Sequence, residues 1–188
     1  MQFESTKIPG LKRIIPKRFT DDRGALIKMH HETEFVKHGL PACFAEEYYS
    51  TSFPLVLRGL HFQVPPCPQS KLVYCIAGTM VDVTVDLRAG SPAYGQWHVE
   101  TLSAVHPVAL FVPSGLAHGV YVSKGEMNAT LVCKATAVYS PEYDGGIHYT
   151  SVGIDWPAGL IISEKDRKLP RLSEFVSPFK FDPAAAGL

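Results

Sequence analysis

Short apolar runs separated by turns fill most of the 188-residue chain. In the clearest run, residues 80–87, a valine or leucine occupies every odd position and a mostly polar residue every even one. A repeat of two residues is typical of a β-strand with one apolar face, so the run predicts a half-buried strand. Similar runs predict further strands at residues 72–76, 109–112, 119–122 and 130–135.

Glycine-containing turns separate these runs, at residues 77–78, 89–92, 113–115 and 124–125. Short strands at this spacing are typical of an all-β sandwich or barrel. Helical patterns are scarce: one short helix is predicted within residues 31–38, and another after Ser163, a candidate N-cap. We therefore predict a single all-β domain over residues 1–188 with a few short helices, ending in a C-terminal arm at 177–188 whose tip, 183–188, is frayed.

Charge and hydropathy narrow the classes of partner. Lys+Arg and Asp+Glu both number 18, so the net charge is zero. This balance excludes a strongly basic nucleic-acid binder, although it is compatible with a local anion pocket. No apolar run approaches the roughly 18 residues of a membrane-spanning helix, and residues 1–7 lack an apolar signal core. We expect a cytoplasmic protein that binds neither nucleic acid nor membrane.

The cysteines suggest neither a disulfide framework nor a zinc site. None of the four forms a Cys-x-x-Cys pair, and the nearby histidines lack zinc-finger spacing. We expect reduced and mostly buried thiols at Cys43, Cys67, Cys75 and Cys133.

Two short segments carry the candidate chemistry. Residues 113–118 fit Pro-x-Gly-x-x-His, which is typical of cupin barrels: the glycine permits a tight turn, and His118 points from a strand into the barrel. Residues 58–63 lie where a metal-binding cupin carries its other ligands. They supply His61 and Gln63 but no glutamate at the expected offset. Two histidines and an amide are a poor ligand set for a divalent metal, so we predict a metal-free, cupin-type antiparallel β-barrel, or jelly roll.

These segments belong to a longer series of matches that spans roughly residues 5–175. On this series the chain resembles the dTDP-4-dehydrorhamnose 3,5-epimerase family. The matching stretches include Phe19–Gly24, Arg58–Gln63, Gln69–Val73, Asp82–Arg88, Pro113–Gly119, Gly153–Pro157 and Ser163–Asp166.

The resemblance implies an isomerase acting on a nucleotide-linked 4-keto-6-deoxyhexose. The C4 ketone acidifies the hydrogens on C3 and C5, so a base can remove one, and a proton then returns to the opposite face. This chemistry requires neither a redox cofactor nor a metal. By the resemblance, His61 is the base, Asp166 orients it, and Lys71 stabilises the enolate oxygen. His61 and Asp166 lie far apart in sequence, so their contact is a prediction about folding.

The resemblance also implies substrate contacts. Arg23 and Arg58 match diphosphate-binding arginines, and Tyr139 matches an aromatic residue that stacks on the nucleotide base. The counterpart of Arg23 reaches in from a neighbouring subunit, which implies a homodimer with exchanged N-terminal strands. Gln63 is a further candidate contact, whereas His118 is either a second active-site histidine or a structural one.

Several positions depart from the family pattern, and three of them are candidate site residues. Cys133 stands where a tyrosine usually reprotonates the enolate. Either one epimerisation is lost, leaving a C3-only or C5-only enzyme, or water or another side chain donates the proton, or the barrel has a different activity. Glu46 and Tyr48 replace a common glutamine and asparagine. They remain candidate substrate contacts, but they leave the nucleotide open between dTDP, CDP and GDP. The alternatives to an epimerase are a non-catalytic barrel that binds a sugar nucleotide and another cupin isomerase.

Overall fold

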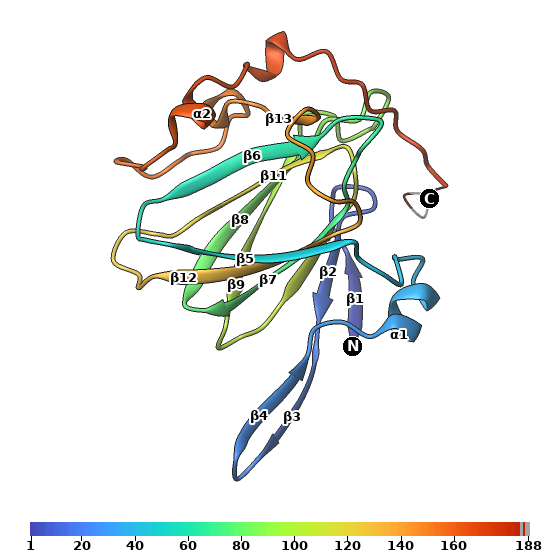
Figure 1. Ribbon diagram of the computed structural model, residues 1–188, viewed down its shortest axis with the longest axis vertical. Coiled ribbons are helices and arrows are strands. Elements are labelled where there is room, and N and C mark those ends of the chain that lie inside the picture. The colour runs from blue at the N-terminus through green and yellow to red at the C-terminus, as the bar shows by residue number, and fades with distance from the viewer. Residues whose placement is uncertain (185, 187–188) are drawn as a thin grey trace.

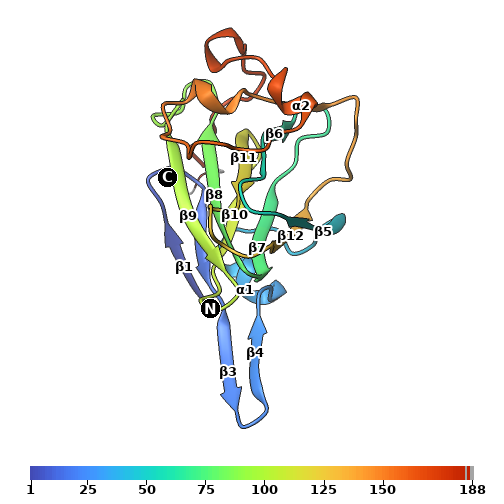
Figure 2. The same cartoon turned by 90° about the vertical axis from the view of Figure 1, so that its left-hand side faces the viewer.

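The computed structural model describes residues 1–184 and 186, and its elements are almost all β-strands (Figures 1 and 2). One antiparallel sheet has the order β1 (Gln2–Ser5), β2 (Lys12–Ile15), β10 (Ala109–Val112), β7 (Lys71–Ala77), β12 (Ala129–Ala135), β5 (Glu46–Ser52). The second has the order β13 (Asp144–Gly146), β6 (Leu57–Gln63), β11 (Leu116–Tyr121), β8 (Thr79–Asp86), β9 (Trp97–Ser103). The two sheets face each other, which confirms the expected all-β, cupin-type barrel.

The remaining elements are short. A hairpin of β3 (Lys17–Asp21) and β4 (Gly24–Lys28) projects from one end of the molecule (Figures 1 and 2). The helices are α1 (Glu32–Lys37), α2 (Glu164–Arg167) and the 3-10 turns η1 (Tyr149–Ser151) and η2 (Leu172–Glu174). None of the helices in the described part of the chain is long and apolar enough to cross a membrane.

The strands and helices expected from the sequence are present. The five predicted runs form β7, β8, β10, β11 and β12. Both predicted helices form as well, as α1 and α2. The Ser163 hydroxyl caps α2 by accepting a hydrogen bond from the backbone N–H of Asp166 at 3.1 Å.

The prediction that β8 is half-buried is wrong. The even positions Asp82, Thr84 and Asp86 are fully buried, and so is Val83 on the other face. β8 lies between β11 and β9, with the barrel interior on one side and the C-terminal segment on the other. Its polar side chains are therefore satisfied inside the protein, by hydrogen bonds such as Thr84 Oγ1 to Asp82 Oδ1 at 3.2 Å.

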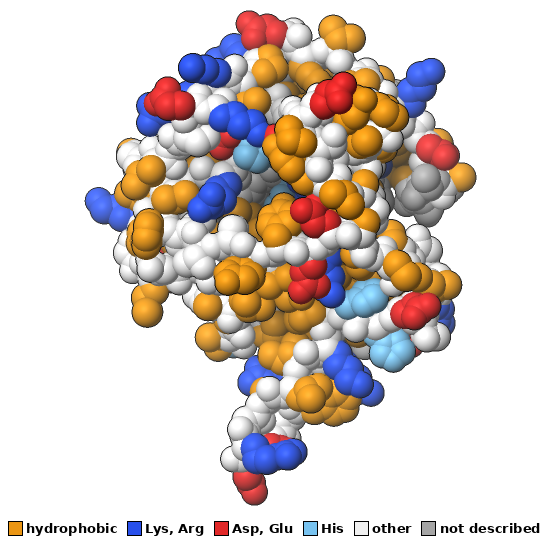
Figure 3. Space-filling model, viewed as in Figure 1, with side chains coloured by type: hydrophobic (Ala, Val, Ile, Leu, Met, Phe, Trp, Pro, Cys, Tyr) orange, Lys and Arg blue, Asp and Glu red, His pale blue; other side chains and the backbone are white. Residues whose placement is uncertain are grey.

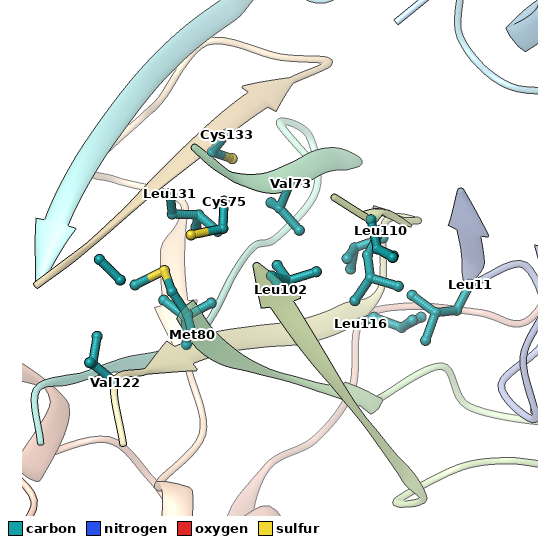
Figure 4. Close-up of a cluster of buried hydrophobic side chains, with 14 of the residues drawn as sticks. Leu11, Val73, Cys75, Met80, Leu102, Leu110, Leu116, Val122, Leu131 and Cys133 are labelled. Atoms are coloured by element: carbon teal, nitrogen blue, oxygen red, sulfur yellow. The ribbon is translucent and has the colours of Figure 1, made fainter. Parts of the chain in front are cut away.

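Three apolar clusters hold the two sheets in place. The first fills the space between the sheets and is shown in Figure 4, where Cys133 extends from β12 beside Val73 and Cys75. A second covers the outer face of the β6–β11–β8 sheet and includes Phe179. The third packs Phe35 of α1 against the outer face of the other sheet. Each fully buried side chain of this kind stabilises the fold by about 1.5–3 kcal/mol.

Residues of the C-terminal segment close one side of the barrel. Phe179 is buried against Phe62, with 5.5 Å between the ring centroids, and Lys180 pairs with Ala89. Within the predicted frayed tip, Pro183 and Ala184 are exposed, but Ala186 is buried and its N–H donates to the Asp182 carbonyl at 3.1 Å, so the prediction is wrong at Ala186. Residues 185, 187 and 188 of that tip lie outside the described residues.

All four cysteines lie in the described region and are free thiols. Only Cys75 and Cys133 are buried, whereas Cys43 is exposed and Cys67 is partly exposed. The expectation of mostly buried thiols therefore holds for two of the four.

Candidate active site

The first element of the site is a histidine–aspartate pair at the mouth of the barrel. His61 on β6 places its Nε2 atom 2.7 Å from Oδ1 of Asp166, although 105 residues separate the two in sequence. The contact forms because the segment leading into α2 runs beside the start of β6, where the Leu57 N–H donates to the Ile161 carbonyl at 3.0 Å. The predicted contact between His61 and Asp166 is thus present.

The backbone before His61 has a conformation that requires glycine. Gly59 has a φ of +141°, and a Cβ atom there would lie 2.5 Å from the Cα of Gly119. The absence of side chains lets β6 and β11 approach closely. His61 is directly opposite His118 in this pairing, so both histidines lie side by side on neighbouring strands.

The surroundings of Asp166 keep its carboxyl ionised. Burial alone would raise its pKa, but hydrogen bonds from His61, from the Gly59 N–H at 3.4 Å and from Ser163 outweigh that effect and lower the pKa. An ionised Asp166 accepts a hydrogen bond from Nε2–H of His61, which leaves Nδ1 as the basic nitrogen of a neutral ring. The arrangement can therefore orient a general base.

A second histidine–aspartate pair lies deeper in the barrel. Nε2 of His118 on β11 is 2.5 Å from Oδ2 of Asp82 on β8, and both side chains are buried. Asp82 was not singled out as a site residue from the sequence, because its place in an alternating strand pointed to solvent. Its pairing with His118 fixes that ring inside the barrel.

Lys71 on β7 supplies a cation from the opposite sheet. It lies on the same strand face as Val73 and Cys75, which are part of the interior cluster. Across the described residues, its ammonium group has neither a hydrogen-bond partner nor an ion-pair partner. Burial lowers the pKa of Lys71, and the negative charges of nearby Asp144 and Asp82 oppose this shift. An unpaired cation of this kind can stabilise a developing oxyanion.

Cys133 and Tyr48 face each other on β12 and β5. They are directly opposite in the strand pairing, so their side chains lie on the same face of the sheet. Cys133 is 2% exposed and Tyr48 is 47% exposed. Burial raises the pKa of the Cys133 thiol, although Lys71 and the Tyr48 hydroxyl act in the opposite direction. Burial and the adjacent thiol likewise raise the pKa of Tyr48.

A cavity of about 320 Å³ opens next to the first pair. Its walls come from β6 and from the segment leading into α2, at Val56, Leu57, Arg58, His61, Ile161, Ile162, Ser163, Lys165 and Asp166. Figure 3 shows this face hollowed over β6 and β11, with histidine side chains inside the hollow and charged groups of both signs around it. The cavity thus brings together the candidate base and one of the two candidate phosphate-binding arginines.

The two arginines have different surroundings. Arg58 is fixed at the cavity, where its Nε donates to Ser52 Oγ at 2.9 Å and its Nη2 to the Thr51 carbonyl at 3.2 Å. Arg23 lies at the tip of the β3–β4 hairpin, almost fully exposed, and pairs with Asp21 at 2.5 Å. The hairpin points away from the rest of the chain (Figures 1 and 2). Within one chain, the structure does not bring Arg23 to the histidines.

A second cavity, of about 530 Å³, is lined by hairpin residues between Phe19 and Lys28 and by none of the histidines. The smaller cavity at His61 is the one that contains the candidate chemistry.

Three further candidate site residues, Glu46, Tyr139 and Gln63, form hydrogen bonds that hold the loop after β12. Glu46 accepts the Tyr139 N–H at 2.6 Å, and the Tyr139 hydroxyl donates to Asp144 at 3.0 Å. Gln63 is buried, with its amide donating to the Cys67 carbonyl at 2.8 Å and accepting from the Ser140 N–H at 2.7 Å. The Gln63 side chain is therefore engaged by backbone groups and holds the loop that carries Tyr139.

Two charged residues of the mouth were missed in the sequence. Asp144 accepts hydrogen bonds from Tyr139 and from Lys165, which ties β13 to α2. Lys165 lies in the Ser163–Asp166 stretch that matches the family, and this match was the signal that could have indicated it. Among the described residues, no group of three or more His, Cys, Asp or Glu side chains is placed to hold a metal ion.

The fold and these contacts define a class of protein: a cupin-type barrel whose interior holds an oriented histidine and an unpaired lysine. A family model for dTDP-4-dehydrorhamnose 3,5-epimerase matches residues 5–174. The chain belongs to this family of isomerases.

Individual relatives agree with this assignment. A dTDP-4-dehydrorhamnose 3,5-epimerase from Methanothermobacter thermautotrophicus is 41% identical over 179 residues, covering 92% of this chain and 95% of that protein. A dTDP-4-dehydrorhamnose 3-epimerase from Streptomyces niveus is 34% identical, covering 93% of this chain and 85% of that protein. A solved structure of a dTDP-6-deoxy-D-glucose-3,5-epimerase from Legionella pneumophila, in complex with dTDP-4-keto-L-rhamnose, has a TM-score of 0.90 and 35% identity, covering 96% of this chain and 99% of that one.

Proposed function

We propose that this protein epimerises a dTDP-linked 4-keto-6-deoxysugar at C3, at C5 or at both carbons. The observation that carries the proposal is the pairing of His61 with an ionised Asp166 on one sheet, opposite an unpaired Lys71 on the other. A sugar ring between the sheets would meet a base on one side and a cation within reach of its C4 oxygen.

The proposed reaction is redox-neutral. Nδ1 of His61 takes a proton from the carbon next to the ketone, and the electrons of that C–H bond move to the C4 oxygen as an enolate. Lys71 stabilises the negative charge, and Asp166 stabilises the imidazolium that forms. A proton added to the opposite face of the same carbon restores the ketone and inverts the centre, so His61 must then return its proton to solvent.

The substrate contacts support a nucleotide diphosphate sugar. Arg58 presents a planar guanidinium at the cavity, which suits the oxygens of a diphosphate. Tyr139 is 49% exposed and is available to stack on a base, with Glu46 beside it. The ligand of the Legionella structure carries dTDP, which favours dTDP over CDP or GDP for this chain.

We further propose a homodimer in which the β3–β4 hairpin reaches a partner subunit. Phe19 and Leu26 on this hairpin are 45% and 57% exposed, and an isolated two-stranded hairpin is marginally stable in water. A second copy would cover these side chains and would bring Arg23 to the partner's substrate. Sedimentation analysis should find a dimer, and a monomer at assay concentrations would contradict the proposal.

The test of the activity is hydrogen exchange in deuterated water, followed by proton NMR on dTDP-, CDP- and GDP-linked 4-keto-6-deoxysugars. The wild-type protein should exchange hydrogen at C3, C5 or both and form the inverted sugar with the dTDP substrate. His61→Asn should lose about 10²–10⁴-fold in rate, because general-base catalysis contributes that much. His106→Asn, at an exposed histidine outside the cavity, is the matched control.

The outcome also separates the alternatives. Exchange at both carbons would indicate a double epimerase, as the Methanothermobacter relative is named, and exchange at one carbon a single-centre enzyme, as the Streptomyces relative is named. A folded protein that binds a substrate but exchanges neither hydrogen would be a binding barrel, and the proposed function would be wrong.

A further inference from the structure

Inversion requires a proton donor on the side of the sugar opposite His61. His61 projects inward from the β6–β11–β8 sheet, so the donor must come from the inner face of the other sheet. Near Lys71, the ionisable residues on that inner face are Lys71 itself, Cys133 and Tyr48, together with Glu46. The question is which of these side chains can deliver a proton to a sugar bound between the two sheets.

Three of the four are poorly suited. Glu46 accepts the Tyr139 N–H at 2.6 Å and so serves as an acceptor. Lys71 would lose the charge that stabilises the enolate if it gave up its proton. Cys133 is 2% exposed and lies at the level of the interior cluster, next to Val73 (Figure 4). Its short side chain leaves the thiol below the surface that a substrate would contact.

Tyr48 meets the requirement. It is directly opposite Cys133 on β5, shares the inward face of the sheet and is 47% exposed, and its side chain is longer than that of the buried thiol. Burial and the neighbouring thiol raise the pKa of its phenol, which keeps the hydroxyl protonated at neutral pH. The hydroxyl is therefore a proton carrier next to Cys133, on the sheet opposite the base.

We propose that Tyr48 is the proton donor of the epimerisation, with the Cys133 thiol beneath it as a hydrogen-bonding support. This inference rests on the proposed function. In the second half of the reaction, the Tyr48 hydroxyl transfers its proton to the carbon of the enolate, the C4 ketone re-forms, and the phenolate takes a proton back from solvent. No oxidant, reductant or metal enters the step.

The test separates proton removal from proton delivery. Tyr48→Phe retains the ring and removes only the hydroxyl. In deuterated water, this variant should still exchange substrate hydrogen on the His61 side near the wild-type rate, because His61 can return a deuteron to the same face. Formation of the inverted sugar should fall by about 10²–10⁴-fold, the usual contribution of a general acid. Tyr49→Phe, one residue further along β5 on the outer face and 72% exposed, should behave as the wild type.

Other outcomes overturn the inference. Inversion by Tyr48→Phe at the wild-type rate would exclude the phenol as the donor. Loss of inversion in Cys133→Ser together with its retention in Tyr48→Phe would assign the thiol. Loss of both exchange and inversion in a Tyr48→Phe protein with unchanged thermal unfolding would place Tyr48 in binding or in proton removal. A wild-type protein that neither exchanges nor inverts would instead refute the proposed function, so the two failures are distinguishable.

Discussion

The barrel contains two histidine–aspartate pairs with nearly the same geometry and different surroundings. His61 lies 2.7 Å from Asp166, and His118 lies 2.5 Å from Asp82. The His61 side chain is 27% exposed and lines the cavity, whereas the His118 side chain is 8% exposed. The distance between histidine and aspartate therefore does not distinguish a candidate catalytic pair from a structural pair. The exposure of the histidine to the cavity does.

The two carboxylates also come from different kinds of element. Asp82 lies within β8, flanked by strands on both sides, and a second hydrogen bond from Thr84 fixes it. Asp166 lies on α2, a four-residue helix outside the sheets, and reaches His61 across the edge of the barrel. The buried pair forms part of the packing of the sheet, while the accessible pair is assembled from a separate segment at the site of proposed chemistry.

Asp166→Asn should have the largest effect, and it tests the contrast between the accessible and the buried pair. We expect kcat to fall by about 10²–10⁴-fold, because an amide can donate to Nε2 of His61 and so stabilise the tautomer whose Nδ1 carries the proton. Steady-state kinetics on the dTDP-linked substrate would measure the loss. The free energy of unfolding, measured with urea, should change less in Asp166→Asn than in the corresponding variant of the buried pair, Asp82→Asn.

The matched variant is Asp82→Asn, the same atomic change in the buried pair. It should lower the free energy of unfolding by about 1–3 kcal/mol, since it weakens a fully buried hydrogen-bond network around His118. Its kcat per folded molecule should fall much less than that of Asp166→Asn. If Asp166→Asn and Asp82→Asn both fold and lose kcat equally, both pairs take part in catalysis. Exposure to the cavity would then not distinguish a catalytic pair from a structural one.

The contrast also shows what the sequence can predict. Apolar alternation predicted the central strands correctly, because burial of aliphatic side chains is a local pattern. It misjudged Asp82, because the group that satisfies this carboxylate, His118, lies 36 residues away. The same alternation that indicates a solvated face in an open sheet is compatible with a polar interior when both faces are covered.

Other features could not be predicted from the sequence, because they depend on the register between strands or on contacts with a second molecule. The pairing of Tyr48 with Cys133 follows from the alignment of β5 with β12, which no local pattern in the chain specifies. The β3–β4 hairpin has no buried face of its own, so neither Phe19 nor Leu26 contributes to a recognisable apolar stripe. The contact of His61 with Asp166 could be predicted only because the family resemblance aligned both residues.

The smallest expected effect is electrostatic: the charge of Asp82, in the buried pair, acts on the pKa of Lys71. Burial lowers the pKa of this lysine, and the negative charge of Asp82 partly opposes the shift. In the proposed reaction a protonated Lys71 stabilises the enolate, so activity should decline on the alkaline side below the usual lysine range of about 10.4. In Lys71→Arg, any residual activity should lack this decline, because a guanidinium stays charged.

Asp82→Asn should move that alkaline limb to still lower pH. The sign follows from the charge: removing a nearby carboxylate disfavours the protonated ammonium and lowers its pKa further. Profiles of kcat against pH would measure the shift, with Asp155→Asn, an exposed residue outside the cavity, as the control. If the alkaline decline of kcat stays at the same pH in Asp82→Asn, the buried pair affects only the fold. If the decline moves to higher pH, Lys71 is not the group that titrates.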